Sequence, residues 1–245
     1  WAGKMFDPLL DFVVANTEDT DIFCFQEVTN ADSQDQDAGG YRTNLFSELE
    51  KVMPNYVGYF AQSQSHCNFT GASRIKVPFG LAMYVRNNVQ VTNYGDLFVY
   101  GRRGFDGEDG TKRPRNLQWI EFNKGDEKYT IANIHGIWNG KGKTDTEDRI
   151  EQSRIAREFL DSRTGKVIFC GDFNLLPETK SIEILESGYL NLIRRYNILT
   201  TRSSLYSKSD RFADYTFVSS NVEIKNFEVP DIKVSDHLPM ILECF

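Results

Sequence analysis

Cysteine is scarce in this sequence, and long hydrophobic runs are absent. The 245 residues contain four cysteines, and no two form a C-x-x-C pair, which excludes zinc and redox sites of that kind. Cys24 and Cys170 stand inside apolar runs, so we expect both to be buried. No apolar run approaches the roughly 20 residues of a membrane span, and the first residues show no secretory signal pattern. We therefore expect a protein of a reducing, cytoplasmic compartment without a membrane span.

The sequence also has no excess of positive charge. Its 28 Lys and Arg residues against 35 Asp and Glu residues give a net charge of −7. Because non-specific binding to nucleic acid needs a cationic surface, this balance disfavours a protein that mainly coats nucleic acid. It leaves room for an enzyme with a local basic groove.

Helical and strand patterns alternate along the whole chain, without a Pro/Ser-rich linker or an internal repeat. Thr144-x-x-Glu147 has the form of a capping box at the start of a helix. The apolar runs 22–25 and 167–170 predict strands that are buried on both faces. At about 150 residues per domain, the length permits one large domain. We expect one monomeric α/β domain over residues 1–245, with two β-sheets packed face to face and helices outside.

Polar side chains follow several of the predicted strands directly. If these strand ends converge, they gather four carboxylates, an amide and two histidines, a set that usually binds a metal or does acid–base chemistry. Oxygen ligands without thiolates favour Mg²⁺, Mn²⁺ or Ca²⁺ over zinc. The segments are Gln26-Glu27, His135-Gly136, Asp172-Phe173-Asn174, Asp214-Tyr215 and Asp236-His237.

The same segments carry a family resemblance, which covers positions 25–237. In them the sequence resembles the endonuclease/exonuclease/phosphatase superfamily, which includes exonuclease III-like and deoxyribonuclease I-like enzymes. The resemblance implies a four-layered α/β sandwich, with two packed mixed β-sheets flanked by helices. It also implies metal-assisted hydrolysis of a phosphoester at one end of the sandwich. The matching stretches are Phe25-Gln26-Glu27-Val28, Asn133-Ile134-His135-Gly136, Gly171-Asp172-Phe173-Asn174, Arg211-Phe212-Ala213-Asp214-Tyr215 and Ser235-Asp236-His237.

The resemblance implies a role for each carboxylate near the metal and the attacking water. Glu27 would be the principal Mg²⁺ ligand, with Mn²⁺ as a substitute, and Asp236 would complete the metal set. Asp172 would orient or deprotonate the water, and Asn174 would hydrogen-bond near the scissile phosphate.

The resemblance also implies that two histidines contact the phosphate. His237 would stabilise negative charge in the transition state, with its ring oriented and kept cationic by Asp214. His135 occupies the place of a phosphate contact or proton donor. Whether His237 or Asp172 is the base stays open at this point.

One family position has no counterpart in the sequence. Family members carry an Asn at the end of a strand just before a stretch like Trp1-Ala2-Gly3, where it helps to place the metal and the Asp172-type carboxylate. No residue stands there, so the domain is expected to be trimmed at its N-terminus.

Two locally basic segments, 100–116 and 191–211, are candidates for substrate binding. We expect them to form a rim that holds a polyanion, with Arg102 and Arg202 as binding residues and Tyr206 available for stacking. The predicted function is Mg²⁺-dependent hydrolysis of a phosphodiester, with nucleic acid as the substrate. The alternatives are hydrolysis of a small, lipid or DNA-end-adduct phosphoester, and a catalytically dead binding module.

Overall fold

The structure is a computed structural model that describes residues 2–32, 40–66, 77–103, 113–140 and 142–245. Its largest element is a six-stranded sheet with the strand order β4-β5-β6-β7-β9-β8. The sheet is mixed, because β6 and β7 run parallel while the other neighbouring strands are antiparallel. The strands are β4 (Val91–Tyr100), β5 (Arg115–Lys124), β6 (Glu127–His135), β7 (Lys166–Asp172), β8 (Leu190–Asn191) and β9 (Asp214–Val218).

Two smaller sheets complete the strands of the described residues. The first has the order β1-β3-β2 and is antiparallel, and its strand β1 contacts β6 and β7 of the large sheet. The second is the antiparallel pair β10-β11 near the C-terminus. The bounds are β1 (Ile22–Thr29), β2 (Tyr56–Gln64), β3 (Phe79–Arg86), β10 (Ile224–Glu228) and β11 (Ile241–Cys244).

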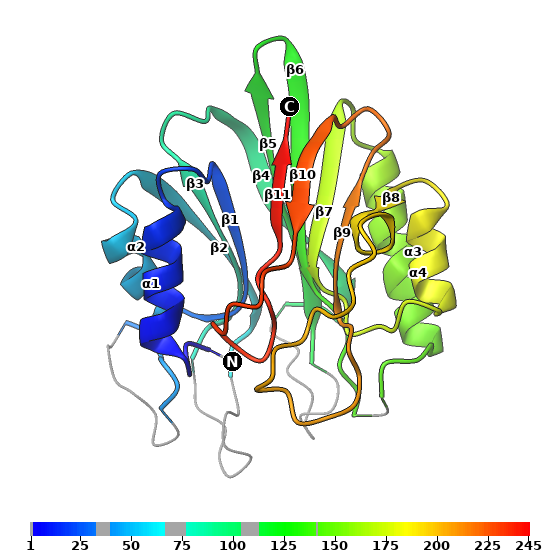
Figure 1. The fold of residues 1–245 in the computed structure, drawn as a ribbon, viewed down its shortest axis with the longest axis horizontal. Helices are drawn as coiled ribbons and strands as arrows, with labels where there is room; N and C mark the ends of the chain where they lie inside the picture. The colour runs from blue at the N-terminus through cyan, green and yellow to red at the C-terminus, as the bar shows by residue number, and fades with distance from the viewer. Residues whose placement is uncertain (1, 33–39, 67–76, 104–112, 141) are drawn as a thin grey trace.

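Helices cover the outer face of each main sheet, as Figure 1 shows. On one side α2 packs against β1 and β2, with α1 beside it, and on the other side α3 packs against β4 and α4. The helices are α1 (Phe6–Asn16), α2 (Leu45–Val52), α3 (Glu147–Asp161), α4 (Lys180–Glu186) and the short α5 (Leu192–Arg195). The layers are thus helix, sheet, sheet and helix, which confirms the predicted fold class. No helix of the described residues is long and apolar enough to span a membrane.

The start of α3 corrects one sequence prediction. The predicted capping box placed Thr144 at the N-cap, but the N-cap is Thr146, whose hydroxyl accepts the backbone N–H of Arg149. Thr144 instead offers its carbonyl to the guanidinium of Arg149, which is buried. The helix therefore begins two residues later than the capping-box pattern indicates, and Thr144 contributes its backbone carbonyl and not its hydroxyl.

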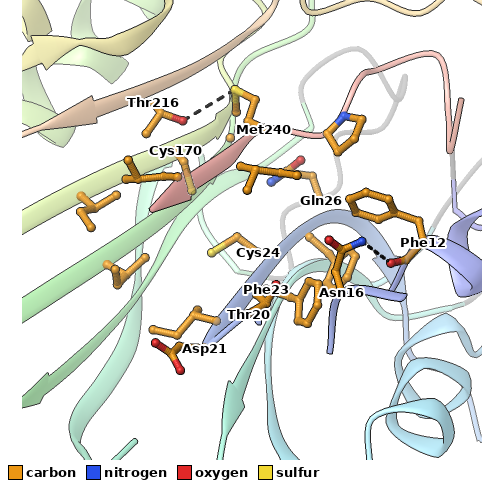
Figure 2. A pocket seen from close by; sticks show the side chains of 18 of the residues that line it. Phe12, Asn16, Thr20, Asp21, Phe23, Cys24, Gln26, Cys170, Thr216 and Met240 are labelled. Carbon is orange, nitrogen blue, oxygen red and sulfur yellow. Dashed lines mark hydrogen bonds between the residues drawn. The ribbon is translucent and has the colours of Figure 1, made fainter. Parts of the chain in front are cut away.

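A pocket of about 1070 Å³ lies over the inner face of the large sheet, between β1 and β11 (Figure 2). Cys24 and Cys170 line it and are only half-buried, and Phe23 is the one fully buried residue of the run 22–25. The prediction that this strand is buried on both faces is therefore wrong, as is the predicted burial of the two cysteines. The pocket removes the cover from one face of β1.

Candidate active site

The strand register brings three of the predicted residues together. His135 at the end of β6 lies opposite Asp172 at the end of β7, and Asp172 lies opposite Asp214 at the start of β9. Because β6 and β7 are parallel while β9 runs back beside them, two strand ends and one strand start meet at the same edge of the sheet. The clustering predicted for these side chains is a direct result of this register.

Glu27 reaches the site through a β-bulge in β1. The pairing with β3 skips from Phe25 to Val28, and Glu27 adopts the left-handed conformation with φ of 57°. A bulge re-aims a side chain, and a non-glycine residue at positive φ costs of order 1–3 kcal/mol, so the surrounding structure must hold it. Its carboxylate Oε1 lies 3.8 Å from His135 Nε2.

A cross-sheet amide pair holds this bulge in place. The Gln26 side chain donates to Asn133 Oδ1 at 2.7 Å, and Asn133 Nδ2 donates to the carbonyl of Phe25 at 3.0 Å. Asn133 belongs to β6 and is fully buried. Both hydrogen bonds hold the two residues directly before Glu27, so they restrain its backbone relative to the large sheet.

Replacing Asn133 by alanine is expected to lower both stability and activity. The change leaves the Phe25 carbonyl and the Gln26 amide without partners, which costs about 1–3 kcal/mol of unfolding free energy. It also frees the bulge, so kcat/KM should fall. The measurement is urea unfolding together with phosphoester hydrolysis.

Gln118 provides the matched control for this prediction. It is a buried amide of β5 that lies opposite Asn133 in the strand register, but its side chain donates across the sheets to the carbonyl of Tyr59 at 2.7 Å and not to the bulge. Gln118→Ala should cost a similar unfolding free energy and leave kcat/KM unchanged at a temperature where both variants are folded. Equal losses of kcat/KM in both variants would contradict the positioning role of Asn133.

The Asp172 carboxylate lies at the centre of the site. Its Oδ2 is 3.6 Å from His237 Nε2 and 3.9 Å from His135 Nε2, and its Oδ1 accepts the backbone N–H of Asn174 at 2.8 Å. Burial, followed by the neighbouring Asp214, raises the pKa of Asp172 above its ordinary value, against the opposing effect of His237. A carboxylate with a raised pKa is the better proton acceptor, which suits it to the role of a base.

The turn after β7 positions Asn174. Asn174 has φ of 55°, a conformation that Asn tolerates better than most residues, and its side-chain amide donates to the carbonyl of Gly136 at 3.3 Å. A Cβ at Gly136 would lie 2.4 Å from the carbonyl oxygen of Phe173. Glycine is therefore required at position 136 for the two turns to touch.

His237 forms an anchored pair with Asp214. Its Nδ1 lies 2.7 Å and 2.9 Å from the two carboxylate oxygens of Asp214, so Nδ1 carries a proton that it donates to them. Burial lowers the pKa of His237, but the carboxylates of Asp214 and Asp172 outweigh burial and raise it above its ordinary value. The ring is thus oriented with Nε2 toward Asp172.

Replacing Asp214 by asparagine is expected to shift the pH–rate profile. If the cationic form of His237 is the active one, activity is lost as the pH rises through its pKa, which Asp214 holds up. Without this carboxylate the pKa falls, so the basic limb of kcat should move to lower pH. A profile of kcat between pH 5 and 9 measures the shift, and an unmoved basic limb would mean that another group produces it.

His135 has a different environment from His237. The guanidinium of buried Arg115 lies 3.3 Å from its Nδ1, so Nδ1 accepts and the proton lies on Nε2. Burial, and secondly Arg115, lower the pKa of His135 well below its ordinary value despite the nearby Glu27. His135 is therefore a neutral donor aimed at Glu27 and Asp172.

The carboxylates present fit a divalent cation. Asp236 gives Oδ2 to Arg202 at 3.2 Å, while its buried Oδ1 has no hydrogen-bond partner among the described residues and is available to a cation. Glu27 and Asp172 each place an oxygen within 4 Å of His135 Nε2, so both carboxylates face the same part of the site. Asp172, Asp214 and His237 also offer ligand atoms within 4.8 Å of one another. Hard oxygen donors of this kind match Mg²⁺ or Mn²⁺.

The predicted substrate residues have different surroundings from those expected. Arg202 is 8% exposed and its guanidinium contacts Asp236 and His237, so it lies inside the site and not on a rim. Tyr206 is half-buried, with its ring centre 4.3 Å from the Arg202 guanidinium. Arg102 is exposed, and much of the basic segment 100–116 around it lies outside the described residues.

Sequence reasoning missed three residues that the structure places at the site. Asn133 stood inside a matching stretch without a role, Arg115 was considered only as part of the basic segment 100–116, and Lys143 was not singled out. Lys143 is 2% exposed, and its ammonium donates to the carbonyl of Phe212 at 2.9 Å. The one sequence signal for Asn133 and Arg115 was a polar residue inside or directly before a predicted strand.

Comparisons with known proteins agree with this geometry. The model of the Endonuclease/Exonuclease/phosphatase family matches residues 6–237. No curated protein matches the sequence. Among solved structures, a mannosyl-6-phosphatase of Bacteroides thetaiotaomicron has a TM-score of 0.74 at 16% identity, covering 98% of this chain and 91% of its own.

Two further solved structures share the fold. Humanized D. rerio TDP2 has a TM-score of 0.70 at 15% identity, covering 99% of this chain and 93% of its own. The human Nocturnin catalytic domain, solved with a bound sulfate anion, has a TM-score of 0.66 at 16% identity, covering 99% and 87%. With the family match over nearly its whole length, the chain belongs to the endonuclease/exonuclease/phosphatase family.

Proposed function

We propose that the protein is a Mg²⁺-dependent phosphoesterase that uses water as the nucleophile. The observation that carries the proposal is the position of Asp172, whose Oδ2 lies within 4 Å of the Nε2 atoms of both His237 and His135. In this arrangement a carboxylate can take a proton from the attacking water while the two imidazoles contact the phosphate oxygens, which suits in-line hydrolysis. Family membership makes phosphoester hydrolysis the expected chemistry.

Each side chain has one task in this proposal. Asp172 orients the water and accepts its proton, and its raised pKa favours that role over His237. His237, held by Asp214, stabilises charge on the phosphate oxygens, and Asn174 and the Nε2–H of His135 donate to the same group. Glu27 and Asp236 would hold the cation, which when bound neutralises phosphate charge and so reduces repulsion of the water.

The geometry of the site favours a compact substrate over a long polyanion. A nucleic-acid substrate was predicted from two basic segments, but Arg202 is buried beside His237 and holds no outer rim. The net charge of −7 also opposes binding of a long polyanion. One of the solved structures named above is a mannosyl-6-phosphatase, which supports a compact phosphoester. Nucleic acid stays the second candidate.

The test is a hydrolysis panel with and without metal. The protein, stripped with EDTA and returned to Mg²⁺, should hydrolyse 4-nitrophenyl phosphate or bis(4-nitrophenyl) phosphate, and added EDTA should abolish the activity. If the substrate is a compact phosphoester, the hydrolysis rate should not depend on the salt concentration between 50 and 200 mM. A steep salt dependence with a preference for long oligonucleotides would establish the nucleic-acid alternative, since phosphate contacts release counterions.

The pocket between β1 and β11 bears on the family Asn that has no counterpart in the sequence. Among the described residues β1 pairs with β3 alone and β11 with β10 alone, so both strands present an unpaired edge to the pocket. The pocket extends to Glu27 and Asp172 at one end. We propose that an added strand carrying the family Asn would fit between these edges and place the Asn at the site.

Adding such an Asn-bearing strand to the N-terminus is therefore expected to raise activity. The added strand pairs with β1, and its Asn supports Glu27 and Asp172, so the Mg²⁺ concentration at half-maximal rate should fall. Mg²⁺ titrations of kcat for the two chains make the measurement. Equal metal affinity and equal turnover would show that this support is dispensable.

A further inference from the structure

Lys143 is a buried cation with few partners. Its side chain is among the largest fully buried ones, and its ammonium has one hydrogen bond among the described residues, to the Phe212 carbonyl. An ammonium carries three N–H donors, so two are left for another acceptor. Burial, followed by the charge of Arg202, lowers the pKa of Lys143 to about 8, whereas Asp172 and Asp214 act in the opposite direction.

Arg202 lies on the same side of the site as Lys143. Its guanidinium contacts His237 Nε2, the atom that faces a phosphate in the proposed function, and it shares Asp236 Oδ2 at 3.2 Å. The Nε–H of Arg202 is buried and has no acceptor among the described residues. A buried N–H without a partner costs free energy, so its retention beside His237 indicates a missing acceptor.

The ring of Tyr206 joins the two cations into one cluster. Its centre is 4.3 Å from the Arg202 guanidinium and 5.0 Å from the Lys143 ammonium. Both cations also act on Asp172, whose pKa they lower. The Lys143–Arg202–Tyr206 cluster is therefore next to the Asp172–His237 pair.

The carboxylates of the site do not provide an ion-pair partner for both Arg202 and Lys143. Arg202 already has Asp236 as its carboxylate partner, and Asp214 has His237. Lys143 makes no ion pair within the described residues, and its one acceptor is a neutral carbonyl. A buried ammonium held only by a neutral group is costly, and an anion with several acceptor oxygens would satisfy it and Arg202 Nε together.

We propose that Lys143 and Arg202 form an anion subsite that selects the dianionic phosphate of a phosphomonoester over the singly charged phosphate of a diester. The inference rests on the proposed function and names its substrate class. A diester phosphate has two non-bridging oxygens and one negative charge. A monoester phosphate presents a third terminal oxygen and a second charge, and the cluster supplies the extra donors and positive charge for them.

The test compares two aryl esters with the same leaving group. In Mg²⁺, the wild-type protein should hydrolyse 4-nitrophenyl phosphate with a higher kcat/KM than bis(4-nitrophenyl) phosphate. Lys143→Met removes the charge and keeps the chain length. It should lower kcat/KM for the monoester by about 30-fold or more, as loss of one charged partner of a buried contact does, and by less than about 3-fold for the diester. Lys180→Met, an exposed lysine of α4 paired with Glu183, is the control and should change neither.

A second measurement tests phosphate binding directly, in case Lys143→Met also impairs catalysis. Inorganic phosphate should inhibit diester hydrolysis competitively, and Lys143→Met should raise its inhibition constant by about tenfold or more. Thermal unfolding of the variant shows whether it is folded. A hexose 6-phosphate and an oligonucleotide with a terminal phosphate then distinguish the two sources of such a monoester.

The outcomes separate the inference from the proposed function. Equal losses on both esters, an unchanged inhibition constant, or a wild type that prefers the diester would overturn the subsite and leave the phosphoesterase proposal intact. A folded, Mg²⁺-loaded wild type that hydrolyses neither ester would overturn the proposed function itself.

Discussion

His237→Ala is expected to lower kcat by on the order of 10³-fold, the size of effect seen when a main electrostatic group is removed. The Nε2 atom of His237 lies 3.6 Å from Asp172 Oδ2, while Nδ1 is anchored by Asp214. In the proposed function this Nε2 atom faces the phosphate oxygens on which charge develops. KM should change far less, because the interaction is strongest in the transition state. Steady-state kinetics with Mg²⁺ and an aryl phosphate make the measurement.

The fold is expected to survive this change. His237 is half-buried in the loop between β10 and β11, and its side chain does not belong to the apolar core. Arg154→Ala, which removes an exposed α3 side chain paired with Glu151, is the control and should keep full activity. A folded His237→Ala protein with near-normal turnover would show that the role given to His237 is wrong.

Asp172→Asn is expected to have a loss of similar size, on the order of 10³-fold or more in kcat. The amide has almost the same shape as the carboxylate, so the contact of Oδ1 with the Asn174 backbone can persist. The amide accepts no proton, however, and it binds a cation more weakly than a carboxylate does. Activity should therefore vanish while the geometry is retained.

Stability gives this prediction a second readout. Because burial raises the pKa of Asp172, its ionised form is unfavourable in the folded protein, and a neutral amide removes that cost. The melting temperature of Asp172→Asn should equal or exceed that of the wild type at pH 7. If the variant is inactive and also melts well below the wild type, the loss of activity is due to unfolding. A stable, active variant would refute the role of Asp172 as the base.

Much of the fold and the clustering of the site could be predicted from strand ends. An apolar strand followed directly by an acid or a histidine places that group at a sheet edge, and this pattern located Glu27, His135 and Asp172. Their meeting depends on the parallel pairing of β6 and β7, which the helix α3 between them favours. The family resemblance of the sequence is confirmed by the match over residues 6–237.

The parts that escaped prediction depend on contacts between distant segments. Arg202 and Lys143 belong to polar loops, where a basic residue is usually solvated, and only the folded chain places both against Tyr206. Asn133 lies within an apolar strand, and nothing local indicates that its partner is Gln26, 107 residues away. The roles of the site residues stay predictions until the variants are measured.

Hydrolysis in ¹⁸O-labelled water tests the central claim most directly. If Asp172 activates water for attack on phosphorus, one turnover with Mg²⁺ places a single ¹⁸O atom in the phosphate product and none in the released alcohol. The wild-type protein should give this result, and Asp172→Asn should give no product on the same timescale. Label in the alcohol, or release of phosphate without label in the first turnover of stoichiometric enzyme, would contradict direct attack of water on the phosphoester.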